Sequence, residues 1–333
     1  MAIPFVLQTD RIRCIDILIN FFTIIYTSKI VLQFFIKMDN NFYHKPVMLD
    51  EVTKYLITKN DGYYVDCTFG GGGHSLNFLK IFDNIKIVAF DQDEDSYIHF
   101  LKDENWDEYR QRVIFCKSNF KNLYLELKKN NISFVNGIFA DLGVSSKQLD
   151  DKDRGFSFIS DTLLDMRMDR TMPVSAYDIV NSFSQQQLEK IFFEYGEESF
   201  SKQIAQEIIN SRIKYKIKTC RQLSDIVSKV KWKKSKINPA TKIFQALRIY
   251  VNDELGSLEK MIDSAAQVLD CSARIVILTY HSLEDRIVKQ KFKDLSKNNF
   301  NIVNKKVIVA TSSEIKDNPR SRSAKMRVLE NIK

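Results

Sequence analysis

Glycines and acidic side chains are spaced in the first half of the chain as in proteins that bind an adenosine-type cofactor. The run Asp66–His74 contains four consecutive glycines, Gly70–Gly73, and glycine lets the backbone approach a ligand without a Cβ clash. Asp91 follows 19 residues after Gly72, a spacing that lets an acid accept hydrogen bonds from both ribose hydroxyls. A glycine loop alone could be a tight turn. Together with the acid, it predicts a cofactor such as NAD or S-adenosylmethionine.

The charges beside the glycines favour one of these two cofactors. An NAD site needs the helix N-terminus to hold a pyrophosphate. Here Asp66 precedes the loop and His74 follows it. An acid near the loop suits an ammonium and a sulfonium better than two phosphates. The residues therefore favour S-adenosylmethionine without excluding NAD.

Two further polar runs follow apolar stretches that are typical of buried strands. Asp141 opens the run Asp141–Ser146, which places its carboxylate near the cofactor and the target atom. Its other interpretation is a helix N-cap. His281, Ser282 and Asp285 follow the second stretch, residues 274–280. A lone histidine is more often structural, but polar residues clustered at a strand end indicate a site.

These residues would be positioned by alternating strands and helices. Strands are expected over 63–66, 85–90, 113–116, 135–140 and 274–280, with helices over 74–81 and 120–129. This alternation predicts an α/β, Rossmann-like fold with a mostly parallel sheet. A late strand is expected within 301–310 and the last over 325–330.

The middle of the chain has a different character. Residues 150–245 have mainly helical patterning, with amphipathic stretches at 185–195 and 200–213 and a third helix at 220–230, for which Thr219 is a candidate N-cap. One long helical region is expected over 240–269. Residues 201–245 carry twelve Lys or Arg against two acids, although the whole chain has a net charge of only +8. This local excess indicates either a surface for a polyanion or a solvated helical face.

The N-terminal residues and the cysteines indicate whether the chain crosses a membrane and in which redox compartment it lies. Residues 1–37 are interpreted as a dispensable extension, with a packed accessory helix and a membrane-surface helix as alternatives. Their longest uncharged run, 17–28, is too short for a membrane span. The five cysteines form no C-x-x-C pair. We therefore expect no metal site and no disulfide framework, and a reducing compartment, the cytoplasm.

Taken together, the motifs resemble those of the MraW family, the small-subunit rRNA methyltransferase H family. The likeness runs from about residue 42 to 330, in order. It rests on His44–Val47, Asp66–Ser75, Asp141–Ser146, Arg154–Phe158, Asp165–Asp169, Tyr195–Glu198, Pro239–Ile249, His281–Val288 and Asn318–Ala324.

The resemblance implies a class I S-adenosylmethionine methyltransferase domain with an inserted helical domain. It divides the chain into a non-family extension (1–37), a first methyltransferase part (38–148), a helical insertion for substrate recognition (149–238) and a second methyltransferase part (239–333). It implies methylation of N4 of a cytidine, cytosine 1402, in the decoding region of 16S rRNA within the small ribosomal subunit. No membrane span is expected, and a homodimer is left open.

The resemblance also assigns site residues. Asp91 would hold the ribose and Phe120 would pack on adenine. Asp141 is the first candidate to accept the N4 proton, although it could serve only the cofactor, and His281, Ser282 and Asp285 are secondary candidates for base contact. The full set of expected cofactor contacts is Gly72, Gly73, His74, Asp91, Phe120, Asp141 and Gln148.

The chain departs from the family pattern at several positions. Cys67 stands where glycine is usual, and Asn238 where histidine is common. Asp270–Ala273 replaces a Pro-Gly-Gly turn before a strand. None of these removes an expected cofactor contact.

Three other classes of protein remain as alternatives. A DNA or small-molecule methyltransferase is disfavoured by the basic stretch and by the missing Pro-Pro motif after Asp141. An NAD oxidoreductase would be stabilised by a different cofactor. A non-catalytic RNA-binding factor would bind rRNA without turnover.

Overall fold

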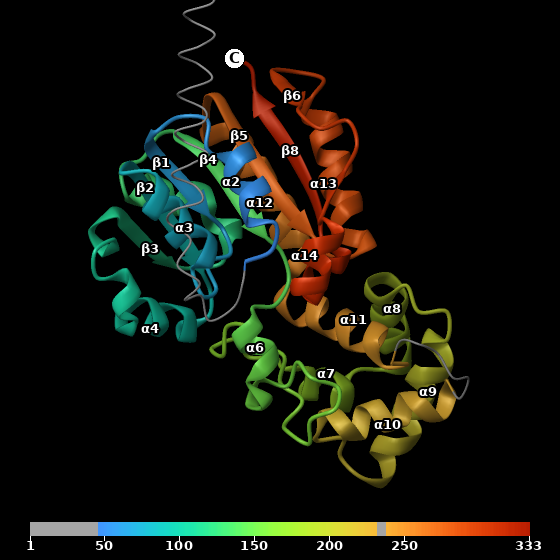
Figure 1. Cartoon of the computed structure of the whole chain (residues 1–333). Helices are drawn as coiled ribbons and strands as arrows, with labels where there is room; N and C mark the ends of the chain where they lie inside the picture. The colour runs from blue at the N-terminus through green and yellow to red at the C-terminus, as the bar shows by residue number, and fades with distance from the viewer. Residues whose placement is uncertain (1–45, 232–237) are drawn as a thin grey trace, which may run out of the picture.

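An eight-stranded sheet forms the larger body of the computed structural model, which describes residues 46–231 and 238–333 (Figure 1). The strands run in the order β3-β2-β1-β4-β5-β8-β6, and β7 also pairs with β8. The first five in this order are parallel, and β8 is antiparallel to β5. This confirms the predicted α/β fold with a mostly parallel sheet. The strands are β1 Asp61–Asp66, β2 Asn84–Asp91, β3 Val113–Lys117, β4 Val135–Asp141, β5 Leu269–Thr279, β6 Phe300–Ile302, β7 Ile308–Val309 and β8 Lys325–Asn331.

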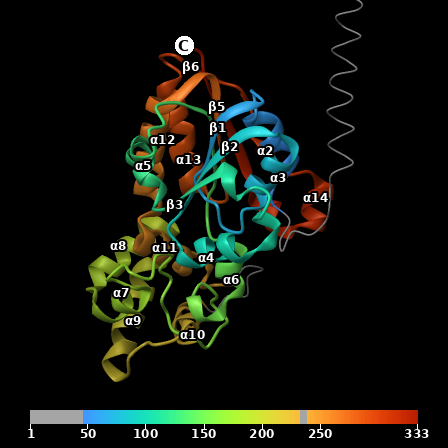
Figure 2. The same cartoon turned by 90° about the vertical axis from the view of Figure 1, so that its left-hand side faces the viewer.

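Helices cover both faces of this sheet (Figure 2). Successive strand residues point to opposite faces, so Val88 packs in one apolar cluster and Ile87 in the other. On the first face lie α5 (Leu123–Lys129), α12 (Glu254–Val268) and α13 (Ser282–Leu295). On the other face lie α2 (Leu49–Leu56), α3 (Gly73–Ile81) and α4 (Glu94–Lys102). The strands are therefore buried on both sides, which explains their continuous apolar runs.

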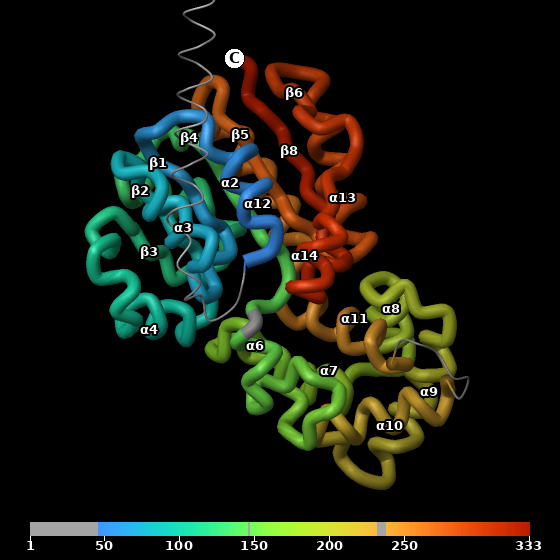
Figure 3. Tube along the Cα trace, viewed as in Figure 1, coloured from blue at the N-terminus to red at the C-terminus, as the bar shows by residue number. Residues whose placement is uncertain are grey.

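A second, helical body follows β4 in the chain and precedes β5 (Figures 1 and 3). It has an apolar core of its own, which includes Leu164, Phe192, Ile208, Leu223 and Leu247. These helices stand where the sequence places an insertion, and Thr219 caps α10 as expected. The domain limits themselves stay a prediction. The helices are α6 Ser146–Asp150, α7 Ala176–Ser182, α8 Gln185–Gly196, α9 Ser201–Lys214, α10 Cys220–Val230 and α11 Thr241–Asn252.

Three local expectations differ from the structure. The helical region expected over 240–269 is two helices, because Asp253 adopts a left-handed conformation (φ 48°) between α11 and α12. The late strand expected within 301–310 is two short strands, β6 and β7. The substituted turn Asp270–Ala273 lies inside β5, where Ser272 has φ 59° and the pairing with β4 shifts register.

The interpretations of residues 1–37 fall on residues outside the described part. Within 46–231 and 238–333, no helix is long and apolar enough to cross a membrane. The four cysteines in that part are free thiols, and Cys67, Cys116 and Cys220 are buried.

Candidate active site

A cavity of about 1100 Å³ opens where the sheet body meets the helical body. It lies at the carboxyl ends of β1, β2, β4 and β5, on both sides of the point where the strand order reverses between β1 and β4. Open α/β sheets bind ligands in this crevice. Its lining residues from the sheet body include Gly70, Gly71, Gly73, His74, Asp91, Phe120, Asp141, Tyr280 and His281, and those from the helical body include Gln148, Phe158, Phe244 and Arg248.

The glycine loop forms one wall of the cavity, but its glycines have different tasks. Gly72 is the N-cap of α3 with φ 73°, and a Cβ there would come within 2.2 Å of Trp106 and 2.5 Å of Phe69. It is not among the cavity-lining residues. Gly71 faces open space, with nothing within 4 Å of an added Cβ. Of the predicted contacts in this loop, the structure brings Gly73 to the cavity, whereas Gly72 is required for packing.

His74 follows the glycines and lines the cavity from α3. Its Nε2 lies 2.9 Å from the backbone oxygen of Val47, to which it donates in the tautomer that this contact favours. Burial lowers the pKa of His74 to about 4. The ring is therefore neutral near pH 7 and holds the chain segment before α2 against the loop.

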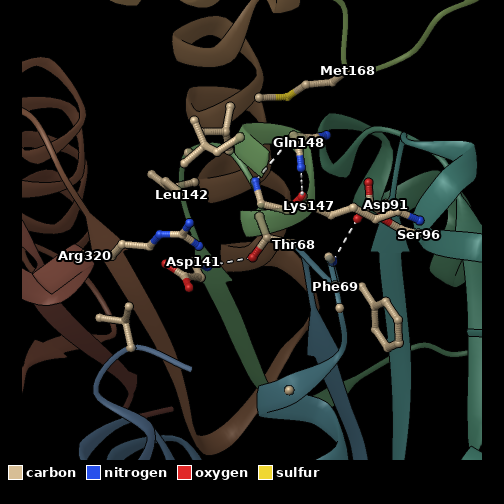
Figure 4. Close-up of a pocket in the computed structure, with 18 of the residues that line it drawn as sticks. Thr68, Phe69, Asp91, Ser96, Asp141, Leu142, Lys147, Gln148, Met168 and Arg320 are labelled. Carbon is tan, nitrogen blue, oxygen red and sulfur yellow. Dashed lines mark hydrogen bonds between the residues drawn. The ribbon is translucent and has the colours of Figure 1, made fainter. Parts of the chain in front are cut away.

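Asp91 lies at the carboxyl end of β2, facing the cavity. Its Oδ2 accepts a hydrogen bond from the Gly70 backbone at 2.8 Å, and its Oδ1 accepts one from Asp93 at 2.8 Å (Figure 4). Burial raises its pKa to about 6. Phe120 opens a short 3-10 turn beyond the next strand and also lines the cavity. The structure thus brings the predicted ribose and adenine residues to one side of the same space.

Asp141 ends β4 at the centre of the cavity (Figure 4). The Tyr280 hydroxyl donates to its Oδ1 at 2.6 Å. Its backbone N–H donates to the Thr68 hydroxyl at 2.7 Å. Burial raises the pKa of Asp141 to about 7, against the opposing effect of the Tyr280 hydrogen bond. A carboxylate with this pKa can both accept and release a proton near neutrality.

The buried carboxylate of Asp66 positions Asp141 through Thr68. Asp66 ends β1, and its Oδ2 accepts a hydrogen bond from the Ser75 hydroxyl at 2.6 Å while its Oδ1 accepts one from the Thr68 backbone at 3.1 Å. This arrangement fixes Thr68, the residue that accepts from the Asp141 backbone. Burial raises the pKa of Asp66 to about 6. Through these hydrogen bonds Asp66 orders the loop. It is not among the cavity-lining residues.

Gln148 lines the cavity from α6, but both ends of its amide already have partners. Its Nε2 donates to Asp93 at 2.7 Å, and its Oε1 accepts from the Ser145 backbone at 3.0 Å. The buried Arg154 donates to the same Asp93 oxygen at 2.7 Å. Gln148 thus links the helical body to the turn beside Asp91, and a ligand would meet the rest of its side chain.

The three residues of the second polar run separate in the structure. His281 lines the cavity, caps α13 and lies 3.0 Å from Glu284. Ser282 donates instead to Glu197 of the helical body. Asp285 holds Arg327 with two hydrogen bonds of 2.7 and 3.1 Å. Neither Ser282 nor Asp285 is among the cavity-lining residues.

Tyr280 and Arg248 are among the polar residues of the cavity wall that sequence reasoning missed. Tyr280 directly follows β5, at the end of the expected strand 274–280, and Arg248 lies on α11 among apolar residues. Arg248 donates to both oxygens of Glu254 at 2.8 Å. Glu254, His281 and Glu284 bring their metal-ligating atoms within 4.8 Å of one another. The Arg248–Glu254 and His281–Glu284 pairs account for the same cluster without a metal ion.

Comparison with known proteins assigns this arrangement to a family. The model of the MraW methylase family matches residues 41–332. The chain belongs to that family. The match covers nearly all of both bodies and confirms the resemblance drawn from the motifs.

Two of the relatives matched by sequence agree with this assignment. The chain is 51% identical over 289 residues to "Ribosomal RNA small subunit methyltransferase H" of Endomicrobium trichonymphae, covering 86% of this chain and 98% of the relative. A Clostridioides difficile protein of the same name is 44% identical, covering 87% and 99%. Among solved structures, an rRNA methylase from Streptococcus thermophilus matches with a TM-score of 0.42 at 9% identity, covering 88% and 99%.

Proposed function

We propose that this chain methylates N4 of a cytidine in the decoding region of 16S rRNA, with S-adenosylmethionine as the methyl donor. Family membership supports a methyltransferase that uses this cofactor and acts on small-subunit rRNA. The finer assignment to N4 of cytosine is what the family resemblance implies. The observation in the structure that supports it is Asp141, a carboxylate with a pKa of about 7 in a cavity large enough for a cofactor and a base.

The cavity residues fit the cofactor. Asp91 would accept from the ribose hydroxyls, Phe120 would pack on the adenine ring, and the backbone around Gly71 and Gly73 leaves open space for the methionine part. When bound, S-adenosylmethionine supplies an electrophilic methyl group on a positively charged sulfur. The carboxylates of Asp91 and Asp141 favour that charge within the cavity.

Cytosine N4 needs help from the protein because its lone pair is delocalised into the ring. The nitrogen gains a methyl group and must lose one proton during the reaction. Asp141 is the acceptor that the cavity offers for that proton. Tyr280 occupies its Oδ1, which leaves Oδ2 to face the amine. Holding donor and acceptor in line supplies a large share of the rate enhancement.

The helical body would close over the target nucleotide. Phe158 and Phe244 line the cavity opposite the glycine loop, and their rings lie edge to face with centroids 6.0 Å apart. A base that has left its stack can pack against such side chains. The excess of positive charge in 201–245 would bind the surrounding rRNA backbone.

The proposal is tested by transfer of labelled methyl from S-adenosylmethionine to small ribosomal subunits that lack this modification. The labelled nucleoside is then identified by mass spectrometry, with fully modified subunits as the control. We expect label in N4-methylcytidine on the unmodified subunits and none on the control. Label in another nucleoside would overturn the base assignment. No label on subunits, with the cofactor still bound, would overturn the substrate.

A further inference from the structure

One of the ion pairs that join the two bodies lies beside the cavity and is exposed to solvent. Arg320 lies in the 3-10 helix η5 (Pro319–Ser323), close to the sheet body, and Asp150 ends α6. The Arg320 Nη2 lies 3.1 Å from the Asp150 Oδ1. Figure 4 shows the guanidinium of Arg320 directed into the cavity, toward the side on which Asp141 lies.

In this ion pair, another anion can readily replace Asp150 beside Arg320. The two side chains of the pair are 42% and 48% exposed, and ion pairs exposed to this degree contribute little to stability. By contrast, Arg154 in the same region is 2% exposed and paired with Asp93, which is 5% exposed. An incoming anion could therefore replace Asp150 at little cost, whereas it could not displace the buried pair.

The position of Arg320 indicates which anion would replace Asp150. A nucleotide that places its base beside Asp141 keeps its phosphates at the cavity mouth, since the base enters and the backbone does not. Arg320 and Lys147 of α6 line the cavity and are both exposed, which places them where the cavity meets solvent. An arginine fork is well matched to phosphate oxygens.

We propose that Arg320 is the binding site for the backbone phosphate of the target nucleotide, with the Asp150 carboxylate as one of its partners until RNA arrives. The inference rests on the proposed function, because it takes the target base to enter this cavity. RNA binding would break the Arg320–Asp150 pair and form an Arg320–phosphate pair.

The test compares Arg320→Gln with Arg322→Gln in the full chain, using unmodified small subunits. Arg322 is an exposed arginine in the same 3-10 helix and does not line the cavity. We expect Arg320→Gln to raise KM for subunits about 10-fold, as for loss of a charge-assisted contact, and to reduce the salt slope of binding by about 1. The affinity for S-adenosylhomocysteine should not change. Arg322→Gln should behave like the wild type.

A second measurement removes the negative charge of the RNA phosphate instead of the positive charge of Arg320. In reconstituted subunits, a methylphosphonate at the target nucleotide should cost the wild type about as much as Arg320→Gln does and cost that variant nothing further. Asp150→Asn, which removes the resident carboxylate, should lower KM about 2- to 3-fold. Weakened S-adenosylhomocysteine binding by Arg320→Gln would overturn the inference in favour of a contact with the cofactor. Equal effects of the Arg320 and Arg322 changes, or additive effects of Arg320→Gln and the methylphosphonate, would also overturn it.

Failure of this inference differs from failure of the proposed function. If the wild type transfers no methyl to subunits, the function is wrong, whatever the binding data show. If it transfers methyl and Arg320→Gln does so with an unchanged KM, only the phosphate site is wrong.

Discussion

Asp141 owes its properties to four neighbours from two segments of the chain, residues 66–68 and 280–284. Tyr280 donates to one carboxylate oxygen, Thr68 fixes the backbone, and Glu284 and Asp66 add negative charge nearby. Burial and the like charges raise the pKa of Asp141, while the Tyr280 hydrogen bond lowers it. The balance keeps the carboxylate close to half-ionised near pH 7, where a proton acceptor works best.

This environment predicts the pH dependence of methyl transfer. The acceptor must be ionised, and burial places the pKa of Asp141 at about 7. The rate should therefore rise with pH through about 7 and reach a plateau above it. Tyr280→Phe should move this rise to higher pH, because it removes the hydrogen bond that lowers the pKa. Single-turnover rates from pH 5.5 to about 9.5 would measure both, and a flat profile in the wild type would contradict the assignment.

Residue types and spacing predicted part of this site. Asp91 and Asp141 are predicted from their positions after strands, because the carboxyl ends of parallel strands meet at one edge, whereas Phe120 is assigned by the family resemblance. Tyr280 and Arg248 could not be found in this way. Arg248 stands among apolar residues of α11 and Tyr280 ends an apolar stretch, so only the folded structure shows that both side chains reach the cavity. In the sequence, Ser282 and Asp285 follow the apolar stretch just as His281 does. In the structure their side chains pair instead with Glu197 and Arg327, which come from distant segments.

At the scale of elements, the glycines in the turn from β1 into α3 have two different roles: one is needed for packing, and another leaves space at the cavity. Gly72 must have positive φ and lies against the aromatic cluster of Phe69, Phe100 and Trp106. Gly71 has no such neighbours. A run of four glycines in a sequence does not reveal at which position the fold requires glycine.

Gly72→Ala should therefore destabilise the fold. Its Cβ would overlap Trp106 at 2.2 Å in a left-handed conformation, which together cost about 2–4 kcal/mol from overpacking and backbone strain. Gly71→Ala is the matched control and should change the free energy of unfolding by less than about 0.5 kcal/mol. Urea unfolding of the two variants would measure this. Equal stability of the two would show that the loop relaxes freely.

The order and type of the strands were predictable because their apolar runs are continuous and end in polar residues. The break between α11 and α12 was not. The apolar pattern continues across residues 240–269, and the left-handed residue is Asp253, with no proline or preceding glycine to mark it. The break lets α11 pack in the helical body while α12 packs on the sheet. Only this division between two cores determines where the helix ends.

At the scale of the whole molecule, positive charge gathers on the helical body. Lys214 and Lys216 are exposed at and after the end of α9. On the sheet body, Lys128 and Lys129 are exposed at the end of α5, which lies far from α9 in Figure 2. If the helical body binds the rRNA backbone, only the first pair should matter for substrate binding.

The double change Lys214→Gln with Lys216→Gln should weaken binding to small subunits and reduce its salt slope by about 1–2, because each lost phosphate contact reduces the slope by roughly 0.7–0.9. Lys128→Gln with Lys129→Gln carries the same change in charge and should leave the slope unaltered. Filter binding at several salt concentrations would measure both. Similar slopes for the two double variants would mean that binding depends on net charge alone.

The most direct measurement is single-turnover methyl transfer to unmodified small subunits by Asp141→Asn, with S-adenosylhomocysteine affinity measured in parallel. The change keeps the size of the side chain and a partner for Tyr280 but removes the proton acceptor. We expect the affinity to stay within a few-fold and the rate to fall by about 10²–10⁴, with Asp141→Ala abolishing turnover. A rate within tenfold of the wild type would contradict the role of Asp141 as acceptor, and a collapse in cofactor affinity would assign it to the cofactor instead.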